Sequence, residues 1–215
     1  MSLDVVQLPL GPFQSNCYVV RRPGAQEGVV VDPGWPGAAR AVVGALAGAS
    51  CAGILVTHGD VDHVAGVAET AAATGAPVHV AAGDRDRLAR PAEHLPPGLD
   101  VELEGHVAEV LLQGDEELSL AGIAFRALKV PGHTSEHLAY AADGCLFSGD
   151  VLFAGSVGRT DRPGDSWEAL IDSIRTLAGR LPPETVVYPG HGPATTLGRE
   201  LATNPFLGEL RAAAQ

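Results

Sequence analysis

Five short apolar runs in this chain are each followed, within three residues, by histidine or aspartate. The runs are VVV, ILV, ALKV, LF and VVY, and the residues that follow them are Asp32, the cluster from His58 to His63, His133, Asp150 and His191. Each run predicts a short buried strand. A strand end is held rigidly, and the loop beyond it is free of the alternation of faces, so several strands can direct ligands at one point. The pattern favours a metal site at one edge of a strand-rich fold.

The densest of these segments is ILVTHGDVDHVAG, which places four metal-binding side chains in six residues. Each residue alone also has a structural explanation, because aspartate caps helices and forms turns, and histidine beside Pro-Gly is common in turns. Together they favour a site, since four of the eight histidines fall in these places. The other four are interpreted as structural or surface residues: His79, His94, His106 and His137.

Strands and helices are predicted in two strand-rich halves, each of which ends with helices. Such halves fit two sheets packed face to face with helices outside. Ser166 is placed to cap the helix that starts at Trp167, and Gly179 to end it. The expected strands are 3–10, 16–22, 28–32, 52–56, 78–80, 108–112, 123–130, 138–142, 145–147 and 185–188, and the expected helices are about 38–49, 64–74, 83–90, 167–177 and a short one after 196.

Composition narrows the classes of partner. The chain has 215 residues and a formal charge of −12, which disfavours nucleic acid. No apolar run reaches the ~20 residues that span a bilayer, and the first residues lack a secretory signal, so we expect no membrane partner and a cytoplasmic location. Cys17, Cys51 and Cys145 have no disulfide or zinc spacing and are expected in the core. The oligomeric state is not indicated.

The cluster and the later histidine and aspartate loops resemble the metallo-β-lactamase superfamily, whose signature is H-x-H-x-D-H. Within it, GSVGRTDRPG, VVYPGHGPATTLGRE and TNPFL look like segments of small bacterial glyoxalase II-like hydrolases. The resemblance implies an α+β fold, an αββα four-layer sandwich of two mixed sheets with helices on the outer faces. It also implies that residues 1–215 form a single domain without the C-terminal helical domain of larger glyoxalase II enzymes.

The family's roles can be carried over residue by residue. Asp150 would bridge two metal ions. Asp32, in VDPG, would support the site from outside the ligands, and we place it with Asp62 as a catalytic carboxylate. The resemblance implies that the first ion is held by His58, position 60, His133 and Asp150, and the second by Asp62, His63, Asp150 and His191.

Position 60 departs from the signature, because Asp60 stands where the family has histidine. Aspartate has a shorter reach, a harder oxygen donor and a negative charge. Three outcomes are open: Asp60 ligates and alters the metal, water fills the gap, or the first site is impaired. We expect ligation, and therefore that Asp60→Ala lowers metal content. The expected cofactors are two divalent ions, zinc first, with iron or manganese as alternatives because of Asp60.

The resemblance implies a metal-dependent hydrolase that cleaves a thioester of a small thiol, such as a 2-hydroxyacyl-glutathione, through a metal-bound hydroxide. Thioesters suit this chemistry because a thiolate with a pKa of about 8.5 leaves without a strong general acid. Arg159 is a candidate contact for the thiol moiety, although an ion pair with Asp161 is the commoner explanation. The alternatives are a mononuclear iron persulfide dioxygenase that uses His58, His133 and Asp150, and a degenerate metal-binding protein without activity.

Overall fold

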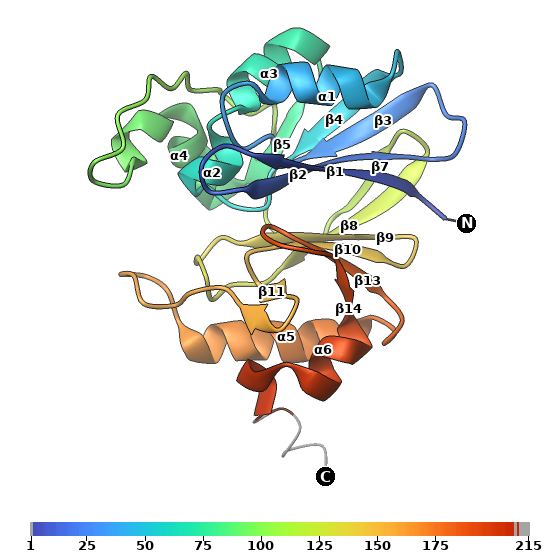
Figure 1. Cartoon of the computed structure of the whole chain (residues 1–215), viewed down its shortest axis with the longest axis vertical. Helices are drawn as coiled ribbons and strands as arrows, with labels where there is room; N and C mark the ends of the chain where they lie inside the picture. The colour runs from blue at the N-terminus through green and yellow to red at the C-terminus, as the bar shows by residue number, and fades with distance from the viewer. Residues whose placement is uncertain (1, 209, 211–215) are drawn as a thin grey trace.

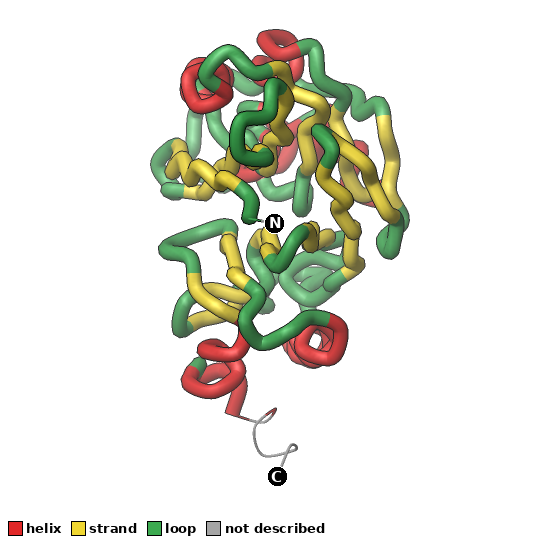
Figure 2. Tube along the Cα trace, turned by 90° about the vertical axis from the view of Figure 1, so that its right-hand side faces the viewer, coloured by secondary structure: helices red, strands yellow, loops and turns green. Residues whose placement is uncertain are grey.

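The computed structural model describes residues 2–208 and 210 of the chain. Within that range, two six-stranded mixed sheets lie face to face and helices cover both outer sides (Figure 1). Seen at right angles, the helices again lie at the two ends and the strands between them (Figure 2). The expected α+β, αββα sandwich is confirmed. None of the described helices is both long and apolar enough to cross a membrane.

The first sheet has the strand order β1-β2-β3-β4-β5-β6. Its first three strands pair antiparallel and the others parallel. Central strands such as β3 are buried on both faces, which is why they read as continuous valine and isoleucine runs. The strands are β1 (Asp4–Leu10), β2 (Ser15–Arg21), β3 (Glu27–Val31), β4 (Ser50–Leu55), β5 (Val78–Ala81) and β6 (Val110–Leu112).

The second sheet has the order β14-β13-β10-β9-β8-β7, antiparallel except for the parallel pair of β10 and β13. A separate two-stranded hairpin follows β10. The strands of the sheet are β7 (Glu117–Leu120), β8 (Ile123–Lys129), β9 (Leu138–Ala142), β10 (Cys145–Gly149), β13 (Val186–Pro189) and β14 (Thr195–Thr196), and those of the hairpin are β11 (Leu152–Phe153) and β12 (Ser156–Val157).

The helices divide between the two outer faces, as Figure 1 shows. On the side of the first sheet lie α1 (Ala38–Leu46), α2 (Val61–Val64), α3 (Val67–Thr74), α4 (Arg85–Ala89) and the 3-10 turns η1 (Ala82–Asp84) and η2 (Pro91–His94). The second sheet is covered by α5 (Trp167–Arg180), α6 (Leu197–Thr203) and η3 (Pro205–Leu207).

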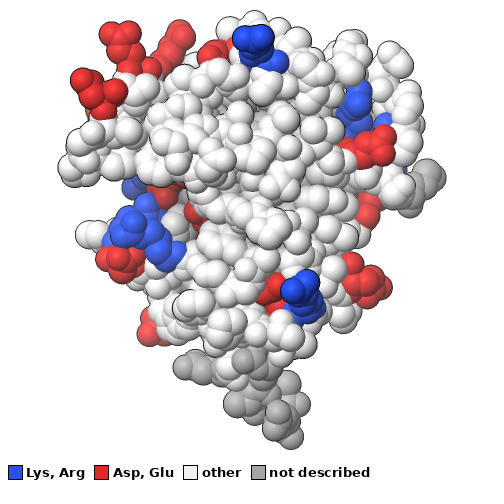
Figure 3. All heavy atoms as spheres, viewed as in Figure 1, with Lys and Arg blue, Asp and Glu red and all other residues white. Residues whose placement is uncertain are grey.

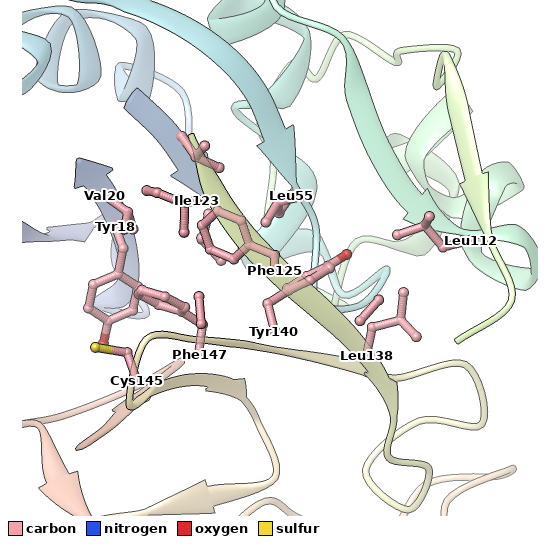
Figure 4. Close-up of a cluster of buried hydrophobic side chains, with 14 of the residues drawn as sticks. Tyr18, Val20, Leu55, Leu112, Ile123, Phe125, Leu138, Tyr140, Cys145 and Phe147 are labelled. Atoms are coloured by element: carbon pink, nitrogen blue, oxygen red, sulfur yellow. The ribbon is translucent and has the colours of Figure 1, made fainter. Parts of the chain in front are cut away.

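The interior between the sheets is apolar and aromatic (Figure 4). Tyr18 from the first sheet stands edge-on to Phe147 from the second, with ring centroids 5.5 Å apart. Burying such side chains favours the folded state by roughly 1.5 to 3 kcal/mol each. Further apolar clusters lie between each sheet and its helices. The layers thus hold the two sheets at a fixed distance, so the loops at one shared edge are rigidly placed.

Several element predictions need correction. Gly179 does not end α5. It is the second-last residue of the helix, which continues to Arg180, because glycine can also adopt helical backbone angles. In place of the helix expected over 64–74 there are two helices, because the helical conformation is interrupted between Val64 and Val67. Strand β7 and the hairpin β11–β12 were missed, because strands of two to four residues carry little periodicity. The N-cap at Ser166 is confirmed, as its side chain accepts from the amide of Ala169.

Candidate metal centre

The expected ligands and Asp32, which is expected to support them, come together at one edge of the sandwich. Asp32 follows β3, the cluster follows β4 and enters α2, and the remaining ligands follow β8, β10 and β13. Two of these strands belong to the first sheet and three to the second, so the site spans both sheets. Three overlapping groups have donor atoms within 4.8 Å of one another: His58, Asp60 and His133; His58, His63 and Asp150; and Asp62, His63 and His191.

We call Asp62, His63, Asp150 and His191, the residues expected at the second ion, the second donor group. Four distances from the Nε2 atoms of His63 and His191 to oxygens of Asp62 and Asp150 lie between 3.3 and 3.7 Å; His63 meets Oδ1 of Asp150 and His191 meets Oδ2. Neighbouring donors about 2.1 Å from a zinc ion at the corners of a tetrahedron are about 3.4 Å apart. The two imidazoles therefore lie at the distance from both carboxylates that neighbouring ligands of one divalent ion have.

The first donor group is also compact. His58 Nε2 lies 3.7 Å and His133 Nε2 3.2 Å from Asp60 Oδ2, and His133 Nε2 lies 3.6 Å from Asp150 Oδ2. Asp60 thus reaches the position of a ligand despite its short side chain. Whether it ligates remains a prediction.

Asp32 fixes the orientation of two histidine rings without being one of the expected ligands. Its oxygens accept from the amide and hydroxyl of Thr57, at 2.7 and 2.6 Å, and Oδ2 lies 3.0 Å from Nδ1 of His63. Because the Thr57 hydroxyl gives its proton to Asp32, it accepts from Nδ1 of His58, 3.0 Å away. Both rings therefore carry the proton on Nδ1 and present a lone pair on Nε2 to the site.

The atoms that face the centre lack protein partners. His58 Nε2, His63 Nε2 and Asp150 Oδ1 are buried and make no hydrogen bond. A buried acceptor without a partner costs roughly 1 to 3 kcal/mol, more when it is charged. A cation beside His63 and Asp150 would satisfy two of these atoms at once, so this observation indicates a metal centre independently of the family pattern.

His137 places the expected bridging aspartate. Its Nε2 accepts from the backbone amide of Asp150 at 3.0 Å, and its ring stacks on His58 with centroids 4.5 Å apart. Burial, together with the nearby histidines, lowers the pKa of His137 well below its ordinary value, so the ring is neutral and able to accept. The sequence interpretation of His137 as a structural or surface residue was incomplete, because its contact with Asp150 depends on the pairing of β9 with β10.

The loop of His191 approaches the site closely because Gly190 has no side chain. A Cβ atom at Gly190 would overlap Asp150 Oδ1 and the ring of His63. The same loop is tied to β2 of the other sheet, where the amide of Asn16 donates to Gly190 O at 2.7 Å and its side-chain nitrogen to Pro189 O at 2.9 Å. The position of His191 thus depends on both sheets.

The cluster carries an excess of negative charge. Burial alone would lower the pKa of His63, but the carboxylates of Asp62 and Asp150 raise it well above its ordinary value. Burial would likewise lower the pKa of His191, yet hydrogen bonds to Asp150 and Asp62 raise it to about 9. Such shifts show a need for positive charge, which a bound divalent ion meets without protonating the rings.

Asp60 is surrounded by arginines that the sequence interpretation did not connect with it. Arg162 Nη1 lies 2.6 Å from Asp60 Oδ2, and Arg87 Nη1 lies 3.4 Å from Oδ1. Burial alone would raise the pKa of the Asp60 carboxyl, but the neighbouring His133, His58 and Arg162 hold it far below its usual range. Asp60 is therefore an ionised carboxylate.

The donors lie in a cleft of about 590 Å³, whose rim carries basic side chains. Arg159 is one of them, and it forms the two-point ion pair with Asp161 anticipated as the commoner explanation, with N–O distances of 2.7 and 2.9 Å. Figure 3 shows basic and acidic side chains gathered at the left of the molecule, between the helical layers. The basic residues that line the cleft are Arg87, Arg159, Arg162 and His94.

Comparison with known proteins agrees with this geometry. The model of the family described as "Metallo-beta-lactamase superfamily" matches residues 10–191, which include every predicted ligand. The chain belongs to the metallo-β-lactamase superfamily. The fold and the family resemblance are thereby confirmed.

Three proteins that are similar to this metallo-β-lactamase superfamily chain carry names that imply different activities or metals. Hydroxyacylglutathione hydrolase GloC of Haemophilus influenzae is 32% identical, over 96% of this chain and 98% of that protein. The crystal structure of BLEG-1 B3 metallo-beta-lactamase is 34% identical, covers 95% of this chain and 100% of its own, and has a TM-score of 0.87. The crystal structure of TTHA1623 in a di-iron-bound form is 37% identical, covers 94% and 100%, and has a TM-score of 0.68.

Four residues that contact this site escaped the sequence interpretation. Thr57 was passed over because threonine at a strand end is common, although it directly precedes His58. Asp84 accepts from the amide of Gly59 at 2.9 Å, and burial raises the pKa of its carboxyl. Arg87 and Arg162 lie far from the cluster in sequence. Arg162 belongs to the GSVGRTDRPG segment, but nothing in that segment connects it with Asp60.

Proposed function

We propose that this chain is a metal-dependent hydrolase of thioesters of a small, anionic thiol, with a 2-hydroxyacyl group as the preferred acyl part. The observation that carries the proposal is that Asp62, Asp150 and His191 of the second donor group line a cleft that Arg87, Arg159 and Arg162 also line. A divalent ion held there would lower the pKa of a water molecule and polarise a carbonyl oxygen. Zinc is the first expectation, because imidazole and carboxylate donors at tetrahedral spacing suit it.

The chain's own residues support this assignment. Asp32 contacts His63 directly and His58 through Thr57, and so keeps both imidazoles in the tautomer that presents Nε2 to the site. Arg87, Arg159 and Arg162 line the cleft, and each is ion-paired with an aspartate. Their further N–H groups favour a substrate that carries carboxylates, as glutathione does. A thioester also suits the site because its thiolate leaves without a proton, whereas the nitrogen of an amide or a β-lactam needs one. The relative named hydroxyacylglutathione hydrolase points to the same class.

The iron dioxygenase alternative is disfavoured by one contact. It requires His133 as an iron ligand, but Arg162 Nη2 lies 3.2 Å from His133 Nε2 and engages the same lone pair. Stoichiometric iron with oxygen uptake on glutathione persulfide would reverse this order.

The test is steady-state hydrolysis by metal-loaded protein of lactoyl-glutathione, a chromogenic β-lactam and a chromogenic phosphodiester. We expect thioester turnover far above that of the other two classes. His63→Gln should reduce it by about 100-fold or more, whereas His106→Gln, a matched change outside the cleft, should leave it unchanged. Turnover of the β-lactam alone would overturn the substrate class, and binding of metal without turnover of any substrate would support the degenerate protein instead.

A further inference from the structure

The backbone and the inner part of the Arg162 side chain are held by Asp165. The backbone amide of Arg162 and its Nε both donate to Asp165 Oδ2, at 3.1 and 3.2 Å. The Asp165 side chain is only 5% exposed, and that of Arg162 is 33% exposed. The loop between β12 and α5 therefore fixes the Arg162 side chain, and its guanidinium lines the cleft.

The guanidinium contacts two donors of the first group at once. Nη1 lies 2.6 Å from Asp60 Oδ2, and Nη2 lies 3.2 Å from His133 Nε2. These are the atoms that a metal ion at this position would need. By contrast, none of the hydrogen bonds among the described residues joins an arginine to Asp62, His63, Asp150 or His191, the members of the second group.

His133 has one lone pair to offer. Its Nδ1 lies 2.9 Å from the carbonyl oxygen of Arg159, which can only accept, so the proton of the neutral ring is on Nδ1. Nε2 is then an acceptor with a single lone pair, and the guanidinium of Arg162 takes it. This also explains why His133 Nε2 and Asp60 Oδ2, both acceptors, lie only 3.2 Å apart. A metal ion and Arg162 exclude each other at His133.

The charges agree with such an exchange. The carboxylates of Asp60, Asp62 and Asp150, with that of Asp165 beside Arg162, carry four formal negative charges. One divalent ion at the second group and the guanidinium groups of Arg162 and Arg87, both of which contact Asp60, supply four positive charges. A second divalent ion would have to share Asp60 Oδ2 with Arg162, so that two like charges would lie on one oxygen.

We propose that the Arg162 guanidinium takes the place of a metal ion at the first donor group, so that the chain binds one divalent ion, at the second group. This inference rests on the proposed metal-dependent function, and it departs from the expectation of two ions with Asp60 as a ligand. It makes Arg162 a permanent cation of the site: a fixed positive charge that chelators do not remove and that faces the substrate cleft.

Metal stoichiometry tests the inference directly. Chelator-stripped protein is titrated with Co²⁺ and followed by absorption, and ions are counted by elemental analysis after gel filtration. We expect one ion per chain for the wild type and two for Arg162→Leu, because the variant frees His133 and Asp60. Arg159→Leu is the matched control: it removes the other arginine of the same loop, keeps the carbonyl that fixes His133, and should bind one ion.

Circular dichroism and a thermal melt establish that each variant is folded, and Arg162→Gln provides a second variant of smaller volume change with the same expected gain. Two ions in the wild type would overturn the inference and leave the hydrolase proposal standing. One ion in both the wild type and the two Arg162 variants would overturn it as well. No ion in the wild type would remove the inference and the metal-dependent function together.

Discussion

Asp32 is the residue on which the orientation of the site depends most. It accepts three hydrogen bonds, from the amide and hydroxyl of Thr57 and from Nδ1 of His63. Through Thr57 it also sets the tautomer of His58. A residue outside the expected ligand set thus decides which nitrogen of two imidazoles faces the cleft.

Asp32→Asn should therefore weaken metal binding about 10- to 100-fold, the usual effect of losing a partner that orients ligands. The amide of asparagine would place a donor against another donor, and the rings would lose their fixed tautomer. The measurement is the dissociation constant from competition with a chromogenic chelator. Asp161→Asn, which changes an exposed carboxylate, is the control, and equal affinity in both variants would contradict the assignment.

At the residue scale, the ligand positions were predictable and their partners were not. His58, His63, His133, Asp150 and His191 all follow strands, and strand ends are visible in the sequence as the ends of apolar runs. Arg162 meets Asp60 across 102 positions, and His137 meets Asp150 through the pairing of two strands. Contacts of this kind arise from the tertiary fold, so a single sequence gives no signal for them.

At the scale of elements, α5 is the helix that the sequence described best. Its buried face of Leu170, Ile174 and Leu177 follows the helical period, and Ser166 caps it. The C-terminal end was misjudged because propensity at a terminal turn is weak compared with packing. Short strands such as β7 and the hairpin β11–β12 depend on pairing partners for their existence, which explains why they escaped prediction.

Ser166→Ala should lower the free energy of unfolding by about 1 kcal/mol, because the amide of Ala169 loses its acceptor at the start of α5. Urea denaturation followed by tryptophan fluorescence measures the change. Ser166→Thr keeps the hydroxyl and should recover most of the loss. An alanine variant as stable as the wild type would show that the cap contributes nothing.

Asn16 joins β2 of the first sheet to the loop after β13 of the second. It is 1% exposed, and its side chain donates to Pro189 O and Gly192 O, both at 2.9 Å. Asn16→Ala should cost about 1 kcal/mol, since the buried Pro189 carbonyl and the exposed Gly192 carbonyl each lose one donor and keep another, from Tyr18 and Gln7. It should also weaken metal binding, because His191 lies between those carbonyls.

Asn16→Ala should change two properties that can be measured separately: the stability of the fold and the metal affinity, which depends on the position of His191. Unfolding in urea gives the first, and chelator competition gives the second. Gln7→Ala is a suitable comparison, because Gln7 also donates to Gly192 O but from a more exposed position. If Asn16→Ala lost stability and kept full metal affinity, the loop of His191 would not depend on β2.

On the scale of the whole molecule, the site lies where the two sheets meet, and each sheet supplies part of the ligand set. Folding brings together three buried ligand atoms that have no hydrogen-bond partner in the protein: His58 Nε2, His63 Nε2 and Asp150 Oδ1. Metal binding is then coupled to the stability of the entire sandwich. The overall layers were predictable because alternation and apolar runs report burial, whereas the meeting of the sheets follows from packing.

Removing the metal should therefore lower the melting temperature. An ion present at 1,000 times its dissociation constant stabilises the native state by about 4 kcal/mol, which corresponds to roughly 8 to 16 °C for a chain of this size. Differential scanning calorimetry with a chelator, and again after zinc is restored, measures the shift. Asp62→Ala should show no response to zinc, and a chelator-insensitive melt of the wild type would contradict the coupling.

The most direct measurement is an anomalous difference map from crystals of the metal-loaded protein, with data on both sides of the absorption edge of the bound metal. The account predicts a peak about 2.0 to 2.2 Å from His63 Nε2, His191 Nε2 and the nearer oxygens of Asp62 and Asp150. Absence of a peak among these four side chains in fully loaded crystals, or a peak elsewhere in the molecule alone, would contradict it.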